Sequence, residues 1–156
     1  MRTLFLLLAI IILAFLGINW PVFLNFFYCK PDLLLIFMVA LVFYTDFKTA
    51  LIFGIIAGLA KDIFLPAAYA INTICFSIWS YLIYRLSLQV STEENFLRWL
   101  IVLVVVLLNN LILGMQSVSS GNIIPFGIFL RNLFIVSVYS TALAPLIFKL
   151  TKKIAA

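Results

Sequence analysis

The sequence predicts an all-α polytopic integral membrane protein with six transmembrane helices. Its 156 residues are 67% hydrophobic and 10% charged, whereas soluble domains are roughly 45 to 50% apolar and about 25% charged. The apolar residues form long runs between charged or turn-forming residues. Because backbone groups in lipid must be hydrogen-bonded within the segment, we expect these runs to be helices.

Six apolar runs define the predicted helices. They cover about residues 3–19, 31–45, 48–65, 67–85, 97–115 and 126–149 of a single domain, residues 1–156. The second run is short, because only 15 residues lie between Lys30 and Asp46. Such a helix is roughly 22 Å long, against about 30 Å for the hydrocarbon core of a bilayer. We therefore expect neighbouring helices to shield it or the bilayer to thin around it.

The ends of these helices carry three further signals. The first run follows a basic residue, as in a signal peptide, but no small-residue cleavage site comes after it, so we expect a retained helix. The aromatic segment from Trp20 to Tyr28 predicts a short surface helix or loop at the membrane interface. Ser91 and Glu94 form a capping-box pattern that predicts the start of the fifth helix.

The net charge of +5 indicates membrane topology. The Lys and Arg residues are scattered between apolar runs and form no basic patch, which argues against nucleic acid as a partner. With six spans and the N-terminus inside, one side carries Arg2, Lys48, Arg85, Arg98, Lys149, Lys152 and Lys153. The other side carries Lys30 and Arg131, and Lys61 lies within a span. Since cytoplasmic loops are enriched in Lys and Arg, both termini are predicted to be cytoplasmic.

The third run contains glycines and charges at helical spacing. Gly54, Gly58 and Asp62 are four residues apart, so they share one face of a helix. Glycines at this spacing let another helix approach closely in lipid. Lys61 lies about 100° away round the helix, so we expect its stem to reach toward the outer surface and not to pair with Asp62.

Two roles remain open for Asp62. An ionisable residue inside a membrane is a functional-site hypothesis, here a ligand cavity or a partner contact. The structural alternative is a pin between helices, in which Asp62 accepts hydrogen bonds from the start of the fourth helix, around Asn72 and Thr73, or pairs with Arg131. The sequence does not decide between these roles.

Other polar and aromatic residues favour structural roles. Asn109 and Asn110 lie in the middle of the fifth run, where side-chain amides usually hydrogen-bond to a neighbouring helix. Trp79, Tyr81 and Tyr84 suggest a pocket lining or an aromatic belt at the interface, and we favour the belt.

The residues for catalysis are few. Histidine is absent, and Cys29 and Cys75 lie in unrelated segments without metal-site or disulfide spacing. Glu93 and Glu94 are adjacent, but acids are favoured at a helix start for structural reasons. We expect no enzyme activity, no metal and no cofactor.

Two short motifs lie about twenty residues apart. "KPDLLLIF" runs from Lys30 to Phe37 and places Pro31 and Asp32 at the start of the second helix. "GIIAGLAKDIF" runs from Gly54 to Phe64 and contains the glycine-aspartate face. Together they resemble the MreD family of bacterial rod-shape-determining proteins, and the resemblance covers the whole chain through its plan of spans. It assigns Gly54, Gly58, Asp62, Pro31 and Asp32 to helix packing or partner contact, and gives Lys61 no role.

The resemblance implies a non-catalytic scaffold in the bacterial inner membrane. Its partners would be an MreC-type single-span protein and, indirectly, the MreB cytoskeleton, RodA and a class B penicillin-binding protein, in the complex that builds lateral peptidoglycan during elongation. The sequence leaves open whether the protein is a monomer or a homodimer.

A second hypothesis comes from the family's distant similarity to the S-components of energy-coupling-factor vitamin transporters. These substrate-binding subunits share a six-helix bundle with a glycine-rich third helix. A transporter subunit would need an apolar pocket with a few polar groups. For that pocket the sequence offers Asp62, Asn72 and Asn122 at its mouth and Arg131 as a further polar group.

Overall fold

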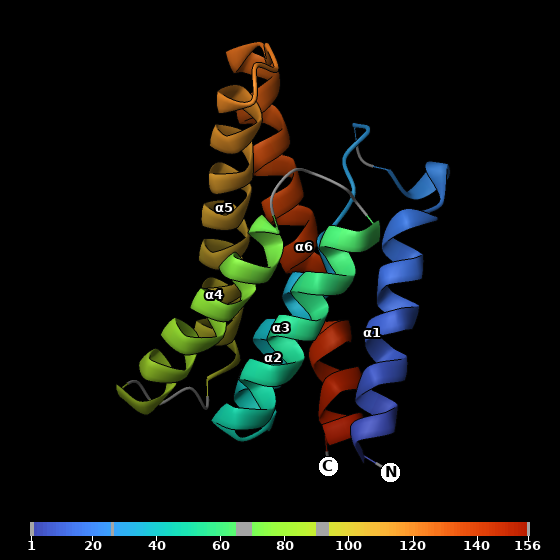
Figure 1. Ribbon diagram of the computed structural model, residues 1–156, viewed down its shortest axis with the longest axis vertical. Helices are drawn as coiled ribbons and strands as arrows, with labels where there is room; N and C mark the ends of the chain where they lie inside the picture. Colours follow the sequence, from blue (N-terminus) through green and yellow to red (C-terminus); the bar gives the residue numbers. More distant parts are fainter. Residues whose placement is uncertain (1, 26, 65–69, 90–93, 156) are drawn as a thin grey trace.

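The computed structural model describes residues 2–25, 27–64, 70–89 and 94–155. Within these ranges the chain folds into six α-helices and one short 3-10 helix (Figure 1). They are α1 (Arg2–Ile18), η1 (Val22–Leu24), α2 (Leu33–Tyr44), α3 (Phe47–Phe64), α4 (Ile71–Gln89), α5 (Asn95–Ser119) and α6 (Phe126–Ala155). The all-α prediction is confirmed, and each predicted helix has its counterpart.

The largest shifts from the predicted bounds concern the last three helices. The helix α4 begins at Ile71 and continues to Gln89, and α6 continues to Ala155. Among the described residues, α5 and α6 are long and apolar enough to cross a membrane by length and composition, and α1 and α2 are shorter apolar helices. A crossing by all six helices therefore stays a prediction.

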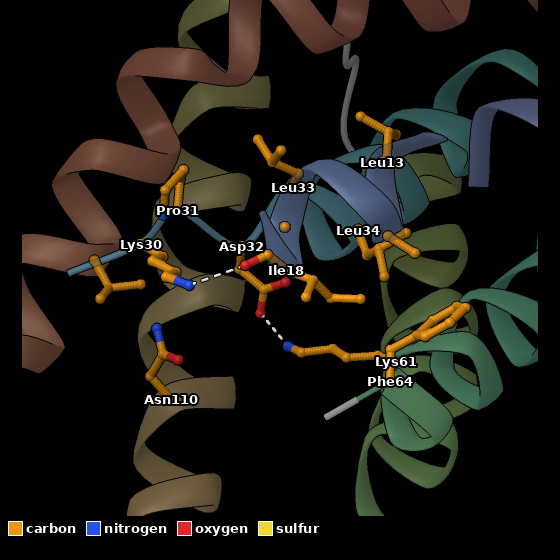
Figure 2. A pocket seen from close by; sticks show the side chains of 13 residues that line it. Leu13, Ile18, Lys30, Pro31, Asp32, Leu33, Leu34, Lys61, Phe64 and Asn110 are labelled. Atoms are coloured by element: carbon orange, nitrogen blue, oxygen red, sulfur yellow. Dashed lines mark hydrogen bonds and ion pairs between the residues drawn. The ribbon is translucent and has the colours of Figure 1, made fainter. Parts of the chain in front are cut away.

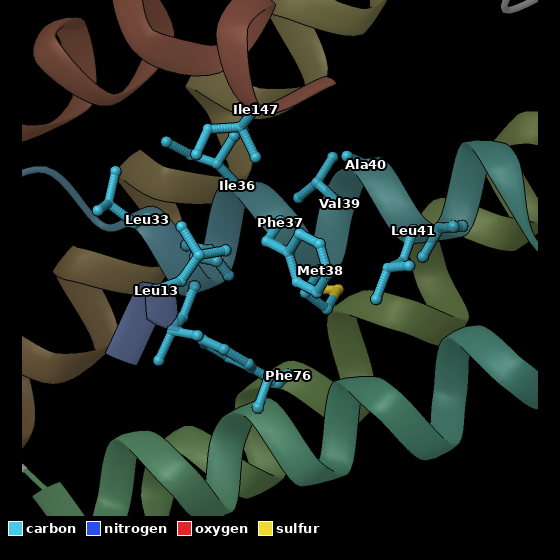
Figure 3. Close-up of a cluster of buried hydrophobic side chains, with 14 of the residues drawn as sticks. Leu13, Leu33, Ile36, Phe37, Met38, Val39, Ala40, Leu41, Phe76 and Ile147 are labelled. Carbon is cyan, nitrogen blue, oxygen red and sulfur yellow. The ribbon is translucent and has the colours of Figure 1, made fainter. Parts of the chain in front are cut away.

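The helix α2 lies at the centre of the bundle. All ten residues from Leu33 to Val42 are buried, and α1, α3, α4, α5 and α6 all pack against it. A helix that is apolar on all sides belongs in an interior, and Figure 3 shows its side chains meeting Leu13 of α1, Phe76 of α4 and Ile147 of α6. The expectation that neighbours shield this short helix is confirmed.

Successive helices alternate in direction (Figure 1), so the start of α1 and the end of α6 lie at the same end of the bundle. The six basic residues Lys48, Arg85, Arg98, Lys149, Lys152 and Lys153 belong to helix ends on that side. Lys30 and Arg131 lie toward the opposite end, in the α1–α2 connection and the second turn of α6. The alternation thus gathers the basic residues as the sequence predicts.

The aromatic segment after α1 contains the short helix η1, as predicted. Its backbone is tied to the bundle, because the carbonyl of Leu24 accepts hydrogen bonds from Trp20 Nε1 at 3.4 Å and from the hydroxyl of Tyr139 at 2.7 Å. The rings of Trp20 and Tyr139 also meet edge to face, 6.2 Å apart. The connection therefore rests on α6, while Val22 and Phe23 stay exposed.

The start of α5 differs from the prediction. The helix begins at Asn95, and Glu94 is the N-cap residue itself, with no side-chain hydrogen bond to the helix. The predicted capping box needs Glu94 inside the first turn, three residues after its cap, so that prediction is wrong for Glu94. Ser91 lies outside the described residues.

Candidate functional site

The glycine face of α3 packs against α4 of the same chain. A Cβ on Gly58 would lie 2.5 Å from the Thr73 Cα and 2.9 Å from the Asn72 carbonyl oxygen. A Cβ on Gly54 would lie 2.5 Å from Ser80 Oγ. Both glycines are buried, so the close helix approach that their spacing allows is made within this chain.

Asp62 continues this face and holds the start of α4. Its Oδ1 accepts hydrogen bonds from the Asn72 backbone N–H at 3.2 Å and from Asn72 Nδ2 at 2.8 Å. Its Oδ2 accepts from the Thr73 backbone N–H at 2.9 Å and from the Thr73 hydroxyl at 2.6 Å. The first N–H groups of a helix have no partner within it and favour a negative charge nearby. Asp62 therefore caps α4 from the neighbouring helix.

Lys61 forms a separate contact in the opposite direction. Its Nζ lies 2.5 Å from Asp32 Oδ2, and the two side chains are only 12% and 9% exposed. Asp32 is the N-cap of α2 and accepts a hydrogen bond from the Leu35 N–H at 3.4 Å, while its own N–H donates to Ser140 Oγ of α6 at 3.1 Å. The ammonium also lies 5.4 Å from the centre of the Phe76 ring in α4, within range for a cation–π contact.

These contacts correct two expectations. Lys61 does not pair with Asp62, as expected, but its ammonium does not reach the surface either, because the Asp32 carboxylate at the start of α2 holds it inside the bundle. Arg131 is exposed near the start of α6, and the carboxylate oxygens of Asp62 are occupied by Asn72 and Thr73 instead. The adjacent charges of Lys61 and Asp62 serve two helix contacts, which we call the α2 clasp (Lys61 and Asp32) and the α4 clasp (Asp62, Asn72 and Thr73).

A third polar contact joins α4 and α5. Trp79 is buried and its Nε1 donates to Asn109 Oδ1 at 3.3 Å. Asn109 thus connects two helices, as its position predicts. Trp79 does not belong to an interfacial belt, because its ring fills the space between helices. Tyr81 is half exposed, and Tyr84 stacks on Phe47 with ring centres 4.8 Å apart.

A cavity of about 230 Å³ lies beside the α2 clasp (Figure 2). Its polar lining is Lys30, Asp32, Lys61 and Asn110, and Pro31 forms part of its wall. The remaining lining comes from α1, the start of α2, the end of α3 and α6, and consists of apolar residues and Gly17. The cavity thus has mostly apolar walls with one polar patch, which consists of Lys30, Asp32, Lys61 and Asn110.

The polar groups predicted for a ligand pocket are not gathered at this cavity. Asn72 is buried and bonded to Asp62, Asn122 is exposed in the α5–α6 connection, and Arg131 is exposed on α6. None of the three lines the cavity. They therefore do not form the polar lining of this cavity, since polarity along the sequence does not tell which side of a helix faces the interior.

Two features of the site were not predicted: the ion pair of Lys61 with Asp32 and the position of Lys30 at the cavity. A signal was present: Asp32 opens one run and Lys61 closes the next, so antiparallel neighbours bring both charges to the same end. Opposite charges inside a membrane tend to pair with one another. That pairing rule, applied between consecutive helices, would have predicted the α2 clasp.

The chemistry available to these residues is hydrogen bonding and charge pairing. Among residues 2–25, 27–64, 70–89 and 94–155, no group of three His, Cys, Asp or Glu side chains is placed to hold a metal ion. Burial raises the pKa of the Cys29 thiol in the α1–α2 connection above its ordinary value. The reactive thiolate is therefore disfavoured there.

The fold and the two clasps define a helical membrane protein whose buried polar side chains join one helix to another. The chain belongs to the MreD family, because the family model described as rod shape-determining protein MreD matches residues 1–154. Membership places the protein in a bacterial membrane with a role in rod shape determination, in a family that is structural and not known as an enzyme. Searches of curated proteins and of solved structures give no match.

Proposed function

We propose that this protein is a non-catalytic scaffold of the inner membrane, which binds an MreC-type partner and helps to couple the MreB cytoskeleton to lateral peptidoglycan synthesis. The observation that carries the proposal is the family match over residues 1–154. In this proposal the chain crosses the membrane six times with both termini in the cytoplasm, and RodA and a class B penicillin-binding protein are reached indirectly.

The distribution of polar contacts supports a scaffold. The carboxylates of Asp32 and Asp62 are both engaged in holding helices of this chain. A fixed bundle of this kind presents a defined outer surface to a partner. The glycine face is occupied by α4, so a partner helix must bind elsewhere.

We propose that the partner's single transmembrane helix binds in the groove between α1 and α6. It has a volume of about 470 Å³ and an apolar lining that includes Phe5, Ile12, Leu146 and Leu150. These four side chains are 44 to 69% exposed. Helix association in lipid depends on close packing, and a groove between two helices offers more contact than a flat helix face.

Co-purification with an MreC-type protein tests the proposal. We expect the solubilised wild-type chain to retain the partner, and Leu146→Trp to reduce retention at least about fivefold by filling the groove, a loss of roughly 1 kcal/mol. Leu100→Trp, at an exposed leucine of α5, is the matched control and should leave retention unchanged.

Two results would count against the proposal. The scaffold role fails if wild-type protein never retains the partner and deletion of the gene leaves rod shape intact. The choice of groove fails if Leu146→Trp and Leu100→Trp retain the partner equally well.

A further inference from the structure

The polar patch of the cavity beside the α2 clasp carries an unbalanced positive charge. Lys30 and Lys61 supply two ammonium groups, and Asp32 supplies one carboxylate. Since Asp32 is held by Lys61 at 2.5 Å, one positive charge is left, and it lies on Lys30. Among the described residues no carboxylate forms an ion pair with Lys30.

The ammonium of Lys30 is held at the cavity by one hydrogen bond, which leaves other N–H donors unused. Its Nζ donates to the carbonyl oxygen of Ile18, the last residue of α1, at 3.2 Å. A carbonyl at a helix C-terminus attracts a cation, so this contact fixes the position of the ammonium without neutralising it. An ammonium has three donors, and two of them remain for a ligand.

Asn110 adds a second donor from the other side. Its Nδ2 is shielded from solvent and has no hydrogen-bond partner in the described structure, although the residue lines the cavity. A buried amide without a partner costs free energy, so such a group calls for an explanation. In Figure 2 the Asn110 nitrogen and the Lys30 ammonium point to the same part of the cavity. A modest rotation about the soft terminal torsion of the amide turns its N–H toward a ligand there.

The size and walls of the cavity restrict the ligand. Its volume of about 230 Å³ is below the roughly 300 to 1,000 Å³ of pockets that enclose a drug-sized molecule. A compact anion fits this space, and Leu13, Phe64 and Val136 in the walls suit an attached apolar chain. A lysine ammonium is a common point-charge partner of phosphate.

We propose that this cavity is a binding site for a phosphate group, held by Lys30 and Asn110 beside the α2 clasp. Its neighbourhood of apolar helices favours the phosphate headgroup of a membrane amphiphile over a soluble phosphate. This proposal does not rest on partner docking in the α1–α6 groove, because it is carried by Lys30 and Asn110, which do not line that groove.

Binding is measured on the purified full-length chain in phosphate-free detergent. The probes are micelles doped with phosphatidic acid, micelles doped with phosphatidylcholine, and inorganic phosphate without added lipid. We expect saturable, one-to-one binding of phosphatidic acid in native mass spectrometry, together with a raised melting temperature. Phosphatidylcholine, which carries no net charge, should bind at least about tenfold more weakly, because its ammonium group opposes the excess charge on Lys30.

Two variants test the named donors. Lys30→Gln and Asn110→Leu should each weaken phosphatidic acid binding about tenfold, as expected for loss of a hydrogen bond to a charged group. Lys149→Gln, an exposed lysine of α6, and Asn122→Leu, in the exposed α5–α6 connection, are matched controls and should bind as the wild type does. Without lipid, Asn110→Leu should melt no lower than the wild type, because the buried Nδ2 that it removes has no hydrogen-bond partner in the described structure.

The outcomes separate the possible sources of the phosphate. Inorganic phosphate that binds as tightly as phosphatidic acid, and with the same loss in Lys30→Gln, supports the site and assigns it to a soluble anion. Equal binding of phosphatidic acid and phosphatidylcholine overturns the proposal. Unchanged binding in both Lys30→Gln and Asn110→Leu also overturns it.

Discussion

Lys61 and Asp62 are neighbours in the sequence, yet they act on different helices. About 100° of rotation separates consecutive residues of a helix, so Lys61 reaches Asp32 at the start of α2 while Asp62 reaches Asn72 and Thr73 at the start of α4. The end of α3 thus holds two helix starts at once. This explains why opposite charges occur inside an apolar run without pairing with each other.

Asp62→Leu is predicted to lower stability more than Asp62→Asn. Leucine removes all four hydrogen bonds, leaves the N–H groups of Asn72 and Thr73 without their acceptor, and should cost about 1 to 2 kcal/mol, as for loss of a helix cap. Asparagine keeps one acceptor oxygen but turns an N–H toward donors, so about half of this loss is expected.

Thermal unfolding in detergent measures both Asp62 variants. Glu94→Gln is the control, because the Glu94 side chain makes no capping hydrogen bond and the change should be within about 0.5 kcal/mol of wild type. A wild-type melting temperature for Asp62→Leu would show that the α4 clasp does not stabilise the bundle.

The α2 clasp should show strong coupling in a double-mutant cycle. Lys61→Met leaves the carboxylate of Asp32 without its ammonium partner, and Asp32→Asn leaves the ammonium of Lys61 without a carboxylate. Both side chains are largely buried. Breaking one half of a buried pair costs more than removing both halves. We expect a coupling free energy of about 1 to 3 kcal/mol.

The same unfolding assay measures the cycle. Lys61→Met combined with Glu94→Gln provides the control cycle, because these residues have no contact, and its coupling should lie within about 0.5 kcal/mol of zero. Additive effects of Lys61→Met and Asp32→Asn would mean that the ion pair contributes nothing.

At the scale of helices, α2 and α3 are each positioned both by close packing and by a polar contact. The twelve residues of α2 are almost all buried, so it is placed by its neighbours and by the Asp32 cap. The helix α3 packs on α4 through glycines, which brings Asp62 within hydrogen-bonding distance of the α4 backbone. The glycine face and the α4 clasp therefore depend on each other.

Gly58→Ala is predicted to separate α3 from α4. The added Cβ meets backbone atoms of Thr73 and Asn72, which cannot move aside as a flexible side chain can, so we expect a loss of about 1 to 3 kcal/mol. Gly127→Ala in α6 is the control, because its Cβ meets nothing within 4 Å and alanine should raise stability by up to about 1 kcal/mol. The melting temperatures of Gly58→Ala and Gly127→Ala test this prediction. Equal values would contradict the close approach of α3 to α4 at Gly58.

At the scale of the whole molecule, alternating helices gather Lys48, Arg85, Arg98, Lys149, Lys152 and Lys153 at one end. Our proposed topology places this end in the cytoplasm, because cytoplasmic segments are enriched in Lys and Arg. The opposite end carries Asn122, and also the α2 clasp with its cavity, whose polar groups lie close to the start of α2. On this topology the phosphate site faces the outer half of the membrane.

Single cysteines test this topology in cells. In a Cys29→Ala, Cys75→Ala background, Asn122→Cys should react with a membrane-impermeant thiol reagent added outside, at a rate at least about tenfold above Lys153→Cys, because only the former lies on the outer side in our topology. Lysing the cells should make Lys153→Cys equally reactive. The reverse pattern in intact cells would invert the topology, and equal labelling of both would reject the placement of these residues on opposite sides.

Much of the fold follows from the sequence through local physics. Runs of apolar residues must form helices in lipid, and the shortness of the second run required shielding, which α2 has. The sequence names Asn72 and Thr73 among the candidate partners of Asp62, which the structure bears out, but it does not reveal that Lys61 pairs with Asp32. The belt prediction for Trp79 is wrong, because α4 continues to Gln89 and so places Trp79 in the middle of the helix, where its ring donates to Asn109 of α5.

The sequence by itself determined the class of protein, the order of the helices that the described residues form, and the face shared by Gly54, Gly58 and Asp62. Only the tertiary structure decided that this face meets α4, that Lys61 pairs with Asp32, and that Lys30 and Asn110 line one cavity. The physical reason is that helical periodicity fixes which residues share a face. Which helix packs on that face depends on contacts between residues far apart in the chain.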